Sequence, residues 1–198
     1  MKKEQLTSHC YPYPRPALTV DIAVLSLPVT LVIGQDTNSN NITSSDNKFL
    51  NSPIDIDNVS VLLIQRGRPP FEGSWALPGG FVDELEPLEH AALRELQEET
   101  NISGLTLQLF SVYGDPGRDP RGWTVSIVYL GLLHSNFLAT AGDDARSLDW
   151  FPLQNLPPLA FDHAQILNDI RSRLIDNGIG NETRFFAWLN RNKVEKNI

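Results

Sequence analysis

The stretch GFVDELEPLEHAALRELQEETNI, residues 80–102, decides the fold of this 198-residue chain. Its central part, residues 87–100, has the composition of a helix. Pro87 suits the first turn, where an N–H group would have no partner, and Glu89 complements the positive end of the helix dipole. Asn101 tolerates the left-handed conformation with which many helices end. We therefore predict a helix that ends at residue 100.

The predicted helix carries an apolar stripe with a cluster of carboxylates beside it. At about 100° per residue, the stripe consists of Leu88, Ala92 and Leu96. Glu95 and Glu99 project close to this stripe, and Glu98 lies on its flank, one turn from Glu95. Carboxylates this close repel one another, and their burial is unfavourable unless a positive charge neutralises them.

A hard divalent cation, Mg²⁺ or Mn²⁺, provides such a charge. Both ions prefer carboxylate oxygens and often share their coordination with substrate phosphates. The cluster therefore favours a metal site at Glu95, Glu98 and Glu99. The alternative is a solvated acidic helix face on which Arg94 pairs with Glu98.

The whole stretch resembles the Nudix box, which is Gly, five residues, Glu, seven residues, Arg-Glu, an aliphatic residue, any residue, Glu-Glu, any residue, Gly and an aliphatic residue. The matching positions are Gly80, Glu86, Arg94, Glu95, Leu96, Glu98, Glu99 and Ile102. The preceding residues 77–79, Leu-Pro-Gly, also fit. The one departure is Asn101 in place of the last glycine, and Asn is the next-best residue for a positive φ.

The resemblance implies the α/β Nudix fold, an α/β/α sandwich with a mixed β-sheet between helices. It implies a metal site formed by Glu95, Glu98, Glu99 and the backbone carbonyl of Gly79. It also implies that Glu86 and Arg94 pair and brace the loop against the helix, which is the support that metal ligands need. The implied reaction is substitution at phosphorus by water, assisted by Mg²⁺.

The general base in this family often lies in a later loop. Asp143, Asp144 and Asp149 are candidates by position, and the alternative is that they form an acidic surface turn.

Further segments look like the ADP-ribose-cleaving branch of the family. They are residues 63–66, 70–71, 75–80, 114–123 and 159–163. Similar patterns occur in Nudix domains fused to nicotinamide mononucleotide adenylyltransferases and in Nudix-related repressors of NAD metabolism. The resemblance implies hydrolysis of ADP-ribose to AMP and ribose 5-phosphate, and a homodimer. Branches of one family share a scaffold while their substrates differ, so this part of the resemblance is weaker than the box.

Cationic and aromatic side chains supply a candidate nucleotide site. Arg66, Arg118 and Arg121 suit bidentate contacts with phosphate, and Phe71 and Trp75 suit stacking on a base or ribose. The alternatives are surface-loop arginines and aromatic residues that cap the core. His163 is either a ligand contact or, as we favour, a hydrogen-bonded structural histidine.

The rest of the chain predicts strands that alternate with a few helices. Strands are expected at 17–33, ending or bulging at Pro28, and at 59–65, 81–82, 105–113, 124–133 and 150–151. Residues 66–80 are expected to be a loop, and residues 161–175 and 183–191 helices. The predicted organisation is an arm at 1–16, a Nudix domain at 17–180 with a flexible insert at 35–58, and a helical tail at 181–198.

Composition limits the partners. The formal net charge is −8 and the pI is about 4.9, so no overall basic footprint favours nucleic acid or an anionic membrane. Cys10 is the only cysteine, which excludes an internal disulfide and suits a reducing compartment. No secretory signal or membrane span is evident, and we expect a cytoplasmic protein whose partner is a small nucleotide.

Three other functions compete with ADP-ribose hydrolysis. The box does not separate ADP-ribose from NADH, 8-oxo-dGTP or a dinucleoside polyphosphate. A second alternative is a transcriptional regulator that senses ADP-ribose, but the box carboxylates are all present and the stretch after Ile175 is too short for a winged helix. A third alternative, a catalytically silent scaffold, is supported only by Asn101.

Overall fold

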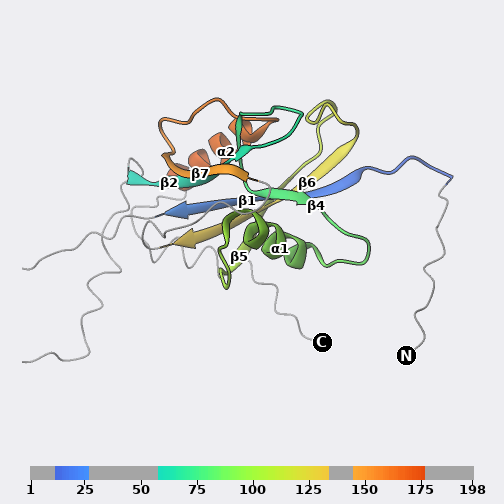
Figure 1. Cartoon of the computed structure of the whole chain (residues 1–198), viewed down its shortest axis with the longest axis horizontal. Coiled ribbons are helices and arrows are strands. Elements are labelled where there is room, and N and C mark those ends of the chain that lie inside the picture. Colours follow the sequence, from blue (N-terminus) through green and yellow to red (C-terminus); the bar gives the residue numbers. More distant parts are fainter. Residues whose placement is uncertain (1–11, 27–57, 134–144, 177–198) are drawn as a thin grey trace, which may run out of the picture.

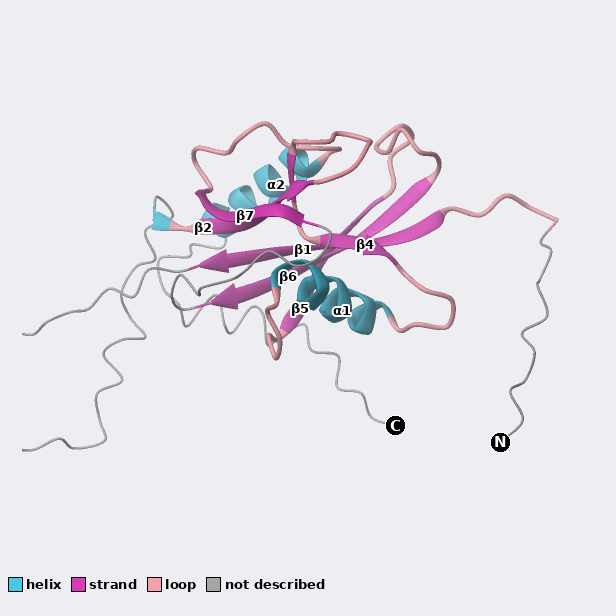
Figure 2. Cartoon of the chain, viewed as in Figure 1, coloured by secondary structure: helices cyan, strands magenta, loops and turns pink. Residues whose placement is uncertain are grey.

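The computed structural model describes residues 12–26, 58–133 and 145–176 (Figure 1). The strands are β1 (Ala17–Ser26), β2 (Ser60–Arg66), β3 (Trp75–Ala76), β4 (Gly79–Phe81), β5 (Leu107–Tyr113), β6 (Thr124–Leu133) and β7 (Ala145–Pro152). The helices are α1 (Leu88–Thr100) and α2 (His163–Asp176). In Figure 2 the strands form one twisted layer.

The sheet is mixed and has β1 at its centre. Its main order is β3-β2-β1-β6-β5, with β4 paired to β1 and β7 paired to β2. β1 runs parallel to β6, and the other pairs are antiparallel. One edge of β1 is shared by two partners, because Asp21 faces Gly79 of β4 while Leu25 faces Val61 of β2. The expected mixed sheet is confirmed.

Each face of the sheet is covered by one helix. Alternate residues of a strand point to opposite faces, and β1 shows this directly. Val20, Ile22 and Val24 pack with α1, whereas Ala23 and Leu25 pack with α2. Figure 1 shows the two helices on different sides of the strands. The two buried clusters make the molecule the α/β/α sandwich that the sequence predicted.

The box helix has the predicted ends. It runs over Leu88–Thr100, with Pro87 as the residue before its first turn. Asn101 has φ 56° and donates its N–H to the carbonyl of Gln97 at 2.9 Å, so asparagine replaces the final glycine without loss of the helix end. The predicted apolar stripe was partly wrong. Leu88 is exposed at the first turn, and Ala91 is buried instead, beside Ala92 and Leu96.

Three expectations about the strands need correction. The predicted loop 66–80 contains two short strands, β3 and β4, because β2 and β1 supply backbone hydrogen-bond partners. The predicted strand 81–82 lies earlier, as β4. The strand around 150–151 is eight residues long, because β7 pairs along the whole of β2. Several predictions concern residues that the structure does not describe. They are the insert 35–58 (except residue 58), the base candidates Asp143 and Asp144, and the helix 183–191.

Candidate active site

Arg94 ties the loop before α1 to the helix. Its Nε and Nη2 donate to the two carboxylate oxygens of Glu86, each at 2.8 Å, and Nη2 also donates to the carbonyl oxygen of Phe81 at 3.1 Å. The hydrogen bonds from Arg94 lower the pKa of Glu86 to about 2. The predicted pairing of Glu86 with Arg94 is therefore present, and it fixes the loop that leads from β4 into α1.

The same arginine contacts two of the three clustered carboxylates. Nη1 of Arg94 donates to Glu95 at 2.7 Å and to Glu98 at 3.3 Å. The Glu95 side chain is 14% exposed and that of Glu98 is 59% exposed. Burial raises the pKa of Glu95 although Arg94 opposes it. Glu98 thus lies on the outer flank, as predicted, and Glu95 lies on the inner side.

Glu99 is the most deeply placed carboxylate of the cluster. It accepts the backbone N–H of Gly79 at 2.8 Å, which links α1 to β4. Burial raises the pKa of Glu99 to about 8, and the charge of Glu95 adds to this, while the Gly79 hydrogen bond and Arg66 act in the opposite direction. The Gly79 hydrogen bond and the charge of Arg66 do not offset the effect of burial on Glu99, so a cation bound nearby would stabilise its carboxylate.

Two glycines let the backbone approach these groups. A Cβ atom on Gly80 would lie 2.5–2.6 Å from the carboxylate atoms of Glu95. A Cβ atom on Gly79 would lie 2.1 Å from the carbonyl oxygen of Val20 in β1. Only glycine fits at either position without a shift of its neighbours, so β4 can pass directly beside Glu95 and β1.

The chemistry of this cluster fits a hard divalent cation. Glu95, Glu98 and Glu99 offer carboxylate oxygens, and burial raises the pKa of Glu95 and of Glu99, so a bound cation would stabilise their ionised forms. Across residues 12–26, 58–133 and 145–176, no group of three or more acidic, histidine or cysteine side chains is arranged so that it could hold a metal ion. Arg94 occupies oxygens of Glu95 and Glu98, and Gly79 occupies one of Glu99.

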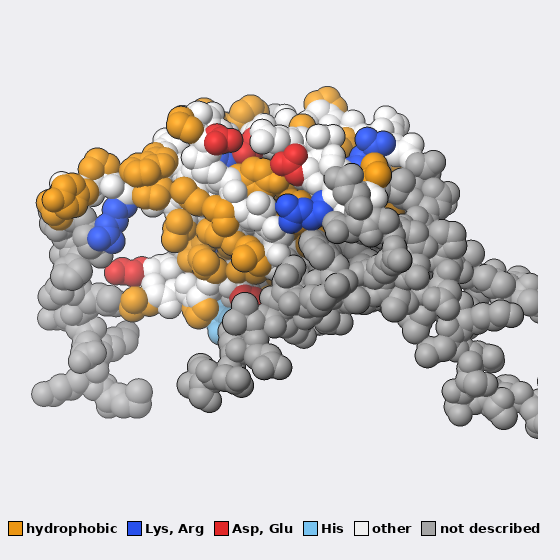
Figure 3. Space-filling view, turned by 180° about the vertical axis from the view of Figure 1, so that it is seen from behind, with side chains coloured by type: hydrophobic (Ala, Val, Ile, Leu, Met, Phe, Trp, Pro, Cys, Tyr) orange, Lys and Arg blue, Asp and Glu red, His pale blue; other side chains and the backbone are white. Residues whose placement is uncertain are grey.

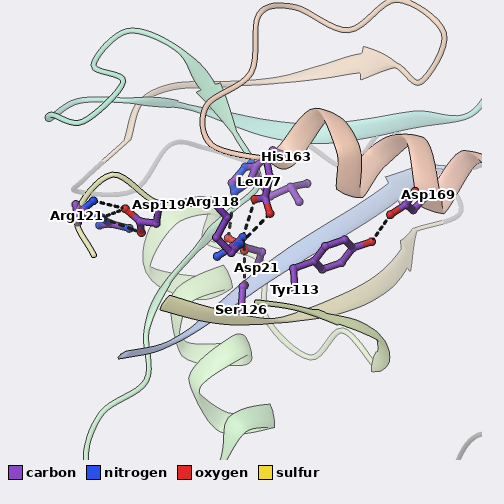
Figure 4. Close-up of polar contacts among 10 residues, drawn as sticks. Asp21, Leu77, Tyr113, Arg118, Asp119, Arg121, Ser126, His163 and Asp169 are labelled. Atoms are coloured by element: carbon purple, nitrogen blue, oxygen red, sulfur yellow. Dashed lines mark hydrogen bonds and ion pairs between the residues drawn. The ribbon is translucent and has the colours of Figure 1, made fainter. Parts of the chain in front are cut away.

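A buried polar cluster lies where β1, β6 and α2 meet (Figure 4). Nδ1 of His163 accepts the N–H of Leu77 at 2.9 Å, so the ring proton is on Nε2, 3.4 Å from Oδ1 of Asp21. Oδ2 of Asp21 accepts the hydroxyl of Ser126. His163 is therefore a hydrogen-bonded structural histidine, as favoured from the sequence, and it holds the segment that leads into Gly79.

Arg118 belongs to this buried cluster. Its Nε and Nη2 donate to the carboxylate of Asp162 at 2.8 and 2.7 Å, and Nη2 lies 3.7 Å from Oδ2 of Asp21. The side chain is only 6% exposed, so it is not a surface-loop arginine. Much of its hydrogen-bonding capacity is committed to Asp162.

Asp21 is the charged centre of the cluster. Burial raises its pKa, but His163, Ser126 and Arg118 outweigh burial and hold the pKa below its usual value. The carboxylate is therefore ionised in the folded protein at neutral pH. Asp21 is not among the residues that the sequence analysis singled out. A single acid within a strand that is otherwise apolar is the signal that would have identified it.

We expect Asp21→Asn to lower the free energy of unfolding by about 3 kcal/mol at pH 7, because it removes one of the two carboxylates that face buried Arg118 and places an amide NH2 group against the donor of either Ser126 or His163. Urea unfolding followed by circular dichroism measures the change. Asp149→Asn, at an exposed aspartate, is the matched control, with an expected change of about 0.5 kcal/mol or less. Equal stability of the two variants would contradict this role for Asp21.

A hollow opens beside Gly79, Gly80 and the buried cluster. It contains about 460 Å³ of empty space, part of it open to solvent, and is lined by residues of β1, β2, β4, the loop 114–123 and the segment before α2. The structure brings Arg66, Arg118 and Arg121 together at this hollow, although they come from two distant parts of the chain. The three arginines line the hollow together with Asp21 and Asp119, and Gly79 and Gly80, which also line it, adjoin Glu99 and Glu95 of α1.

Arg66 and Arg121 are held less completely than Arg118. Nε of Arg66 donates to the carbonyl oxygen of Pro70 at 2.8 Å, and burial together with the charge of Arg121 lowers the pKa of Arg66. Nε and Nη2 of Arg121 donate to Asp119 at 3.0 and 2.7 Å, and the Arg121 side chain is 38% exposed. Each guanidinium keeps donor groups beyond these contacts.

The two predicted stacking residues differ in their surroundings. Phe71 is 42% exposed and has φ 60°, and its ring meets Phe161 edge-on at 4.9 Å. Trp75, in β3, packs against the hydrophobic core, and its ring centroid lies 4.7 Å from that of Phe151. Neither Phe71 nor Trp75 lines the hollow, and exposed Asp149, the described base candidate, does not line it either. Phe161 and Phe81 line the hollow but were not singled out from the sequence.

Within the described residues, neither helix, α1 nor α2, is long and apolar enough to cross a membrane.

The NUDIX domain family matches residues 54–170, more than half of the chain. An ADP-ribose pyrophosphatase of Methanocaldococcus jannaschii is 47% identical over 116 residues, which cover 59% of this chain and 68% of that protein. The ADPR responsive transcriptional repressor NtrR of Acinetobacter baylyi is 31% identical over 179 residues, 88% of this chain and 59% of the repressor.

A solved structure also aligns over most of the chain. The NUDIX domain of Shewanella oneidensis NrtR, crystallised with ADP ribose, aligns with this fold at a TM-score of 0.63. The two are 29% identical, and the alignment covers 88% of this chain and 99% of that domain. Together with the box helix, its brace and its carboxylates, these matches show that the chain belongs to the Nudix domain family and is a Nudix pyrophosphohydrolase.

Proposed function

We propose that the protein hydrolyses ADP-ribose to AMP and ribose 5-phosphate, with Mg²⁺ held by Glu95, Glu98, Glu99 and the carbonyl oxygen of Gly79. The observation that carries the proposal is the hollow itself, which is lined by Arg66, Arg118 and Arg121 and by Gly79 and Gly80, the two glycines that adjoin Glu99 and Glu95 of α1. The 47% identity with an ADP-ribose pyrophosphatase supports the choice of substrate.

In this proposal, different residues bind the diphosphate, position α1 and accept the proton of the attacking water. Arg66 and Arg121 bind phosphate oxygens through their free donors, and Glu86 and Arg94 keep α1 and its loop in register. Bound Mg²⁺ would supply charge neutralisation and activation of water. Water forms a bond to one phosphorus while that atom's bond to the bridging oxygen breaks. In this proposal Glu99, whose carboxylate accepts only the Gly79 N–H within the described part of the chain, takes up the proton that the water loses, with bound Mg²⁺ keeping the carboxylate ionised before the reaction.

The similarity to the repressor supports one alternative, an ADP-ribose sensor. Both functions need ADP-ribose to bind, and they differ in turnover. On the face drawn in Figure 3, Lys and Arg side chains lie in separate spots instead of one continuous basic patch. The net charge of −8 also gives no general attraction to DNA.

The test is to incubate the purified protein with Mg²⁺ and ADP-ribose, in parallel with NADH, 8-oxo-dGTP and diadenosine polyphosphates, and to separate the products by chromatography. We expect AMP and ribose 5-phosphate from ADP-ribose at the highest kcat/KM, and no turnover after Mg²⁺ is chelated. Mn²⁺ in place of Mg²⁺ compares the two cations.

Each outcome has a definite meaning. Preferred cleavage of another diphosphate keeps the Nudix reaction and rejects ADP-ribose as the substrate. Tight ADP-ribose binding without turnover of any compound rejects hydrolysis and supports the sensor, which salt-dependent DNA binding would then test.

A further inference from the structure

Two arginines of the hollow converge on a single aromatic ring. The Cζ atom of Arg66 lies 4.8 Å from the ring centroid of Phe161, and that of Arg121 lies 5.1 Å from it. Both distances are within the range of cation–π attraction. Arg121 also lies 4.9 Å from the ring centroid of Phe81, on the β4 side of the hollow. Phe161 therefore brings together two cations that are far apart in the sequence.

The Phe161 ring is fixed from several directions. Its backbone has φ 54°, a left-handed conformation that is unfavourable for a residue of this size. The ring packs edge-on against Phe71 at 4.9 Å and lies tilted against the His163 ring at 5.4 Å. The preceding residue, Ala160, is fully buried and donates its N–H to the carbonyl of Trp75 at 2.8 Å. The surrounding structure thus holds the ring in a costly position at the hollow.

Holding two guanidinium groups at one ring is also electrostatically unfavourable. Their charges repel, and the ring quadrupole and Asp119 offset only part of that repulsion. An anion between the two groups would remove it. Phosphate is the anion that suits them best, because guanidinium donors match its oxygens in pairs.

We propose that Phe161 is a positioning residue that holds Arg66 and Arg121 together for a phosphate group of the substrate. This inference rests on the proposed function, because it assumes that the hollow receives a diphosphate. Phe161 does not contact the reacting atoms in this account. It acts through the two arginines, so its loss should weaken substrate binding more than it slows the chemical step.

The main experiment compares Phe161→Leu with Phe161→Tyr on the diphosphate substrate that the wild-type protein cleaves fastest. We expect Phe161→Leu to raise KM about tenfold with kcat within about twofold, since two cation–π contacts are lost, and Phe161→Tyr to stay near the wild type. The matched control is Phe110→Leu. Phe110 makes the same kind of contact, with Arg173 at 4.8 Å, on β5 away from the hollow, and its replacement should leave KM unchanged.

A double-mutant cycle shows whether Phe161 acts through the arginines. In a protein that already carries Arg66→Gln and Arg121→Gln, Phe161→Leu should change KM by less than about twofold. A tenfold increase in that background, or an unchanged KM in the wild-type background, would overturn the proposal. If Phe161→Leu does not fold, pentafluorophenylalanine at position 161 keeps the size of the ring while removing its negative face, and the same rise in KM is expected.

A binding measurement separates this inference from the substrate assignment. Inorganic pyrophosphate is titrated by calorimetry into the metal-free protein, with and without Phe161→Leu. We expect about tenfold weaker binding by the variant, even if ADP-ribose proves not to be the substrate. Equal affinities for pyrophosphate would reject the role of Phe161 and leave the proposed hydrolysis standing.

Discussion

Glu99→Gln is expected to lower kcat by about a thousandfold, with a much smaller change in KM. The amide removes the negative charge that would hold Mg²⁺ and accept a proton, while it keeps the shape of the side chain and can still accept the N–H of Gly79. Steady-state kinetics on the preferred diphosphate substrate measure the effect. Glu89→Gln, on the first turn of the same helix, is the matched control and should retain full activity.

The pH dependence of stability provides a second measurement on the same variant. Folding raises the pKa of Glu99 from 4.5 to about 8, so without metal the folded state binds more protons than the unfolded state between these values. The stability that Glu99 contributes is complete below pH 4.5 and is lost as the pH rises through about 8. We expect the melting temperature of the metal-free wild type to fall across this window. Glu99→Gln should lose most of the slope, and an identical slope in both proteins would contradict the assignment.

Gly79→Ala is expected to cost about 4 kcal/mol or more, which is enough to unfold many domains. The added Cβ would lie 2.1 Å from the carbonyl oxygen of Val20 and 3.0 Å from the Cα of Asp21. Both contacts are with the backbone of β1, so no side-chain rotation relieves them. Urea unfolding measures the free energy, and hydrolysis of the substrate measures the damage to the site.

The control for this variant is Gly104→Ala. Gly104 also has a positive φ, 72°, but nothing lies within 4 Å of its would-be Cβ. Its replacement should therefore carry only the conformational cost, about 1 kcal/mol. If the two alanine variants proved equally stable, the close approach of β4 to β1 would not be the reason for glycine at position 79.

Sequence reasoning succeeded where the decisive interactions are local. The composition of residues 87–100 located α1, and the resemblance to the Nudix box implied the contact of Glu86 with Arg94 that the structure contains. The positions of Glu95 and Glu98 relative to the apolar side follow from the helical repeat. In each case the partners are close in the sequence, so the helix and the short loop before it set their geometry.

It failed where partners are distant in the chain. β3 and β4 lie in a segment rich in glycine and proline and exist because β2 and β1 supply hydrogen bonds. Arg118 was predicted to contact phosphate, with a surface-loop arginine as the alternative, and its buried pairing with Asp162 was missed because Asp162 is 44 residues away. Asp21 and Ser126 are 105 residues apart, so a buried polar cluster could not be assembled from the order of the residues.

The central position of β1 has a consequence for how the chain acquires its structure. β1 is apolar toward both faces of the sheet, and its longest pairing is with β6, where Ala17 faces Thr124 and Ser26 faces Leu133. Parallel pairings between such distant segments are slow to form, because closing a long stretch of chain costs conformational entropy before the paired strands stabilise it. During synthesis β1 leaves the ribosome long before β6, with its Val and Ile side chains uncovered. β1 is thus paired late, and its uncovered apolar side chains expose the chain to aggregation in that interval.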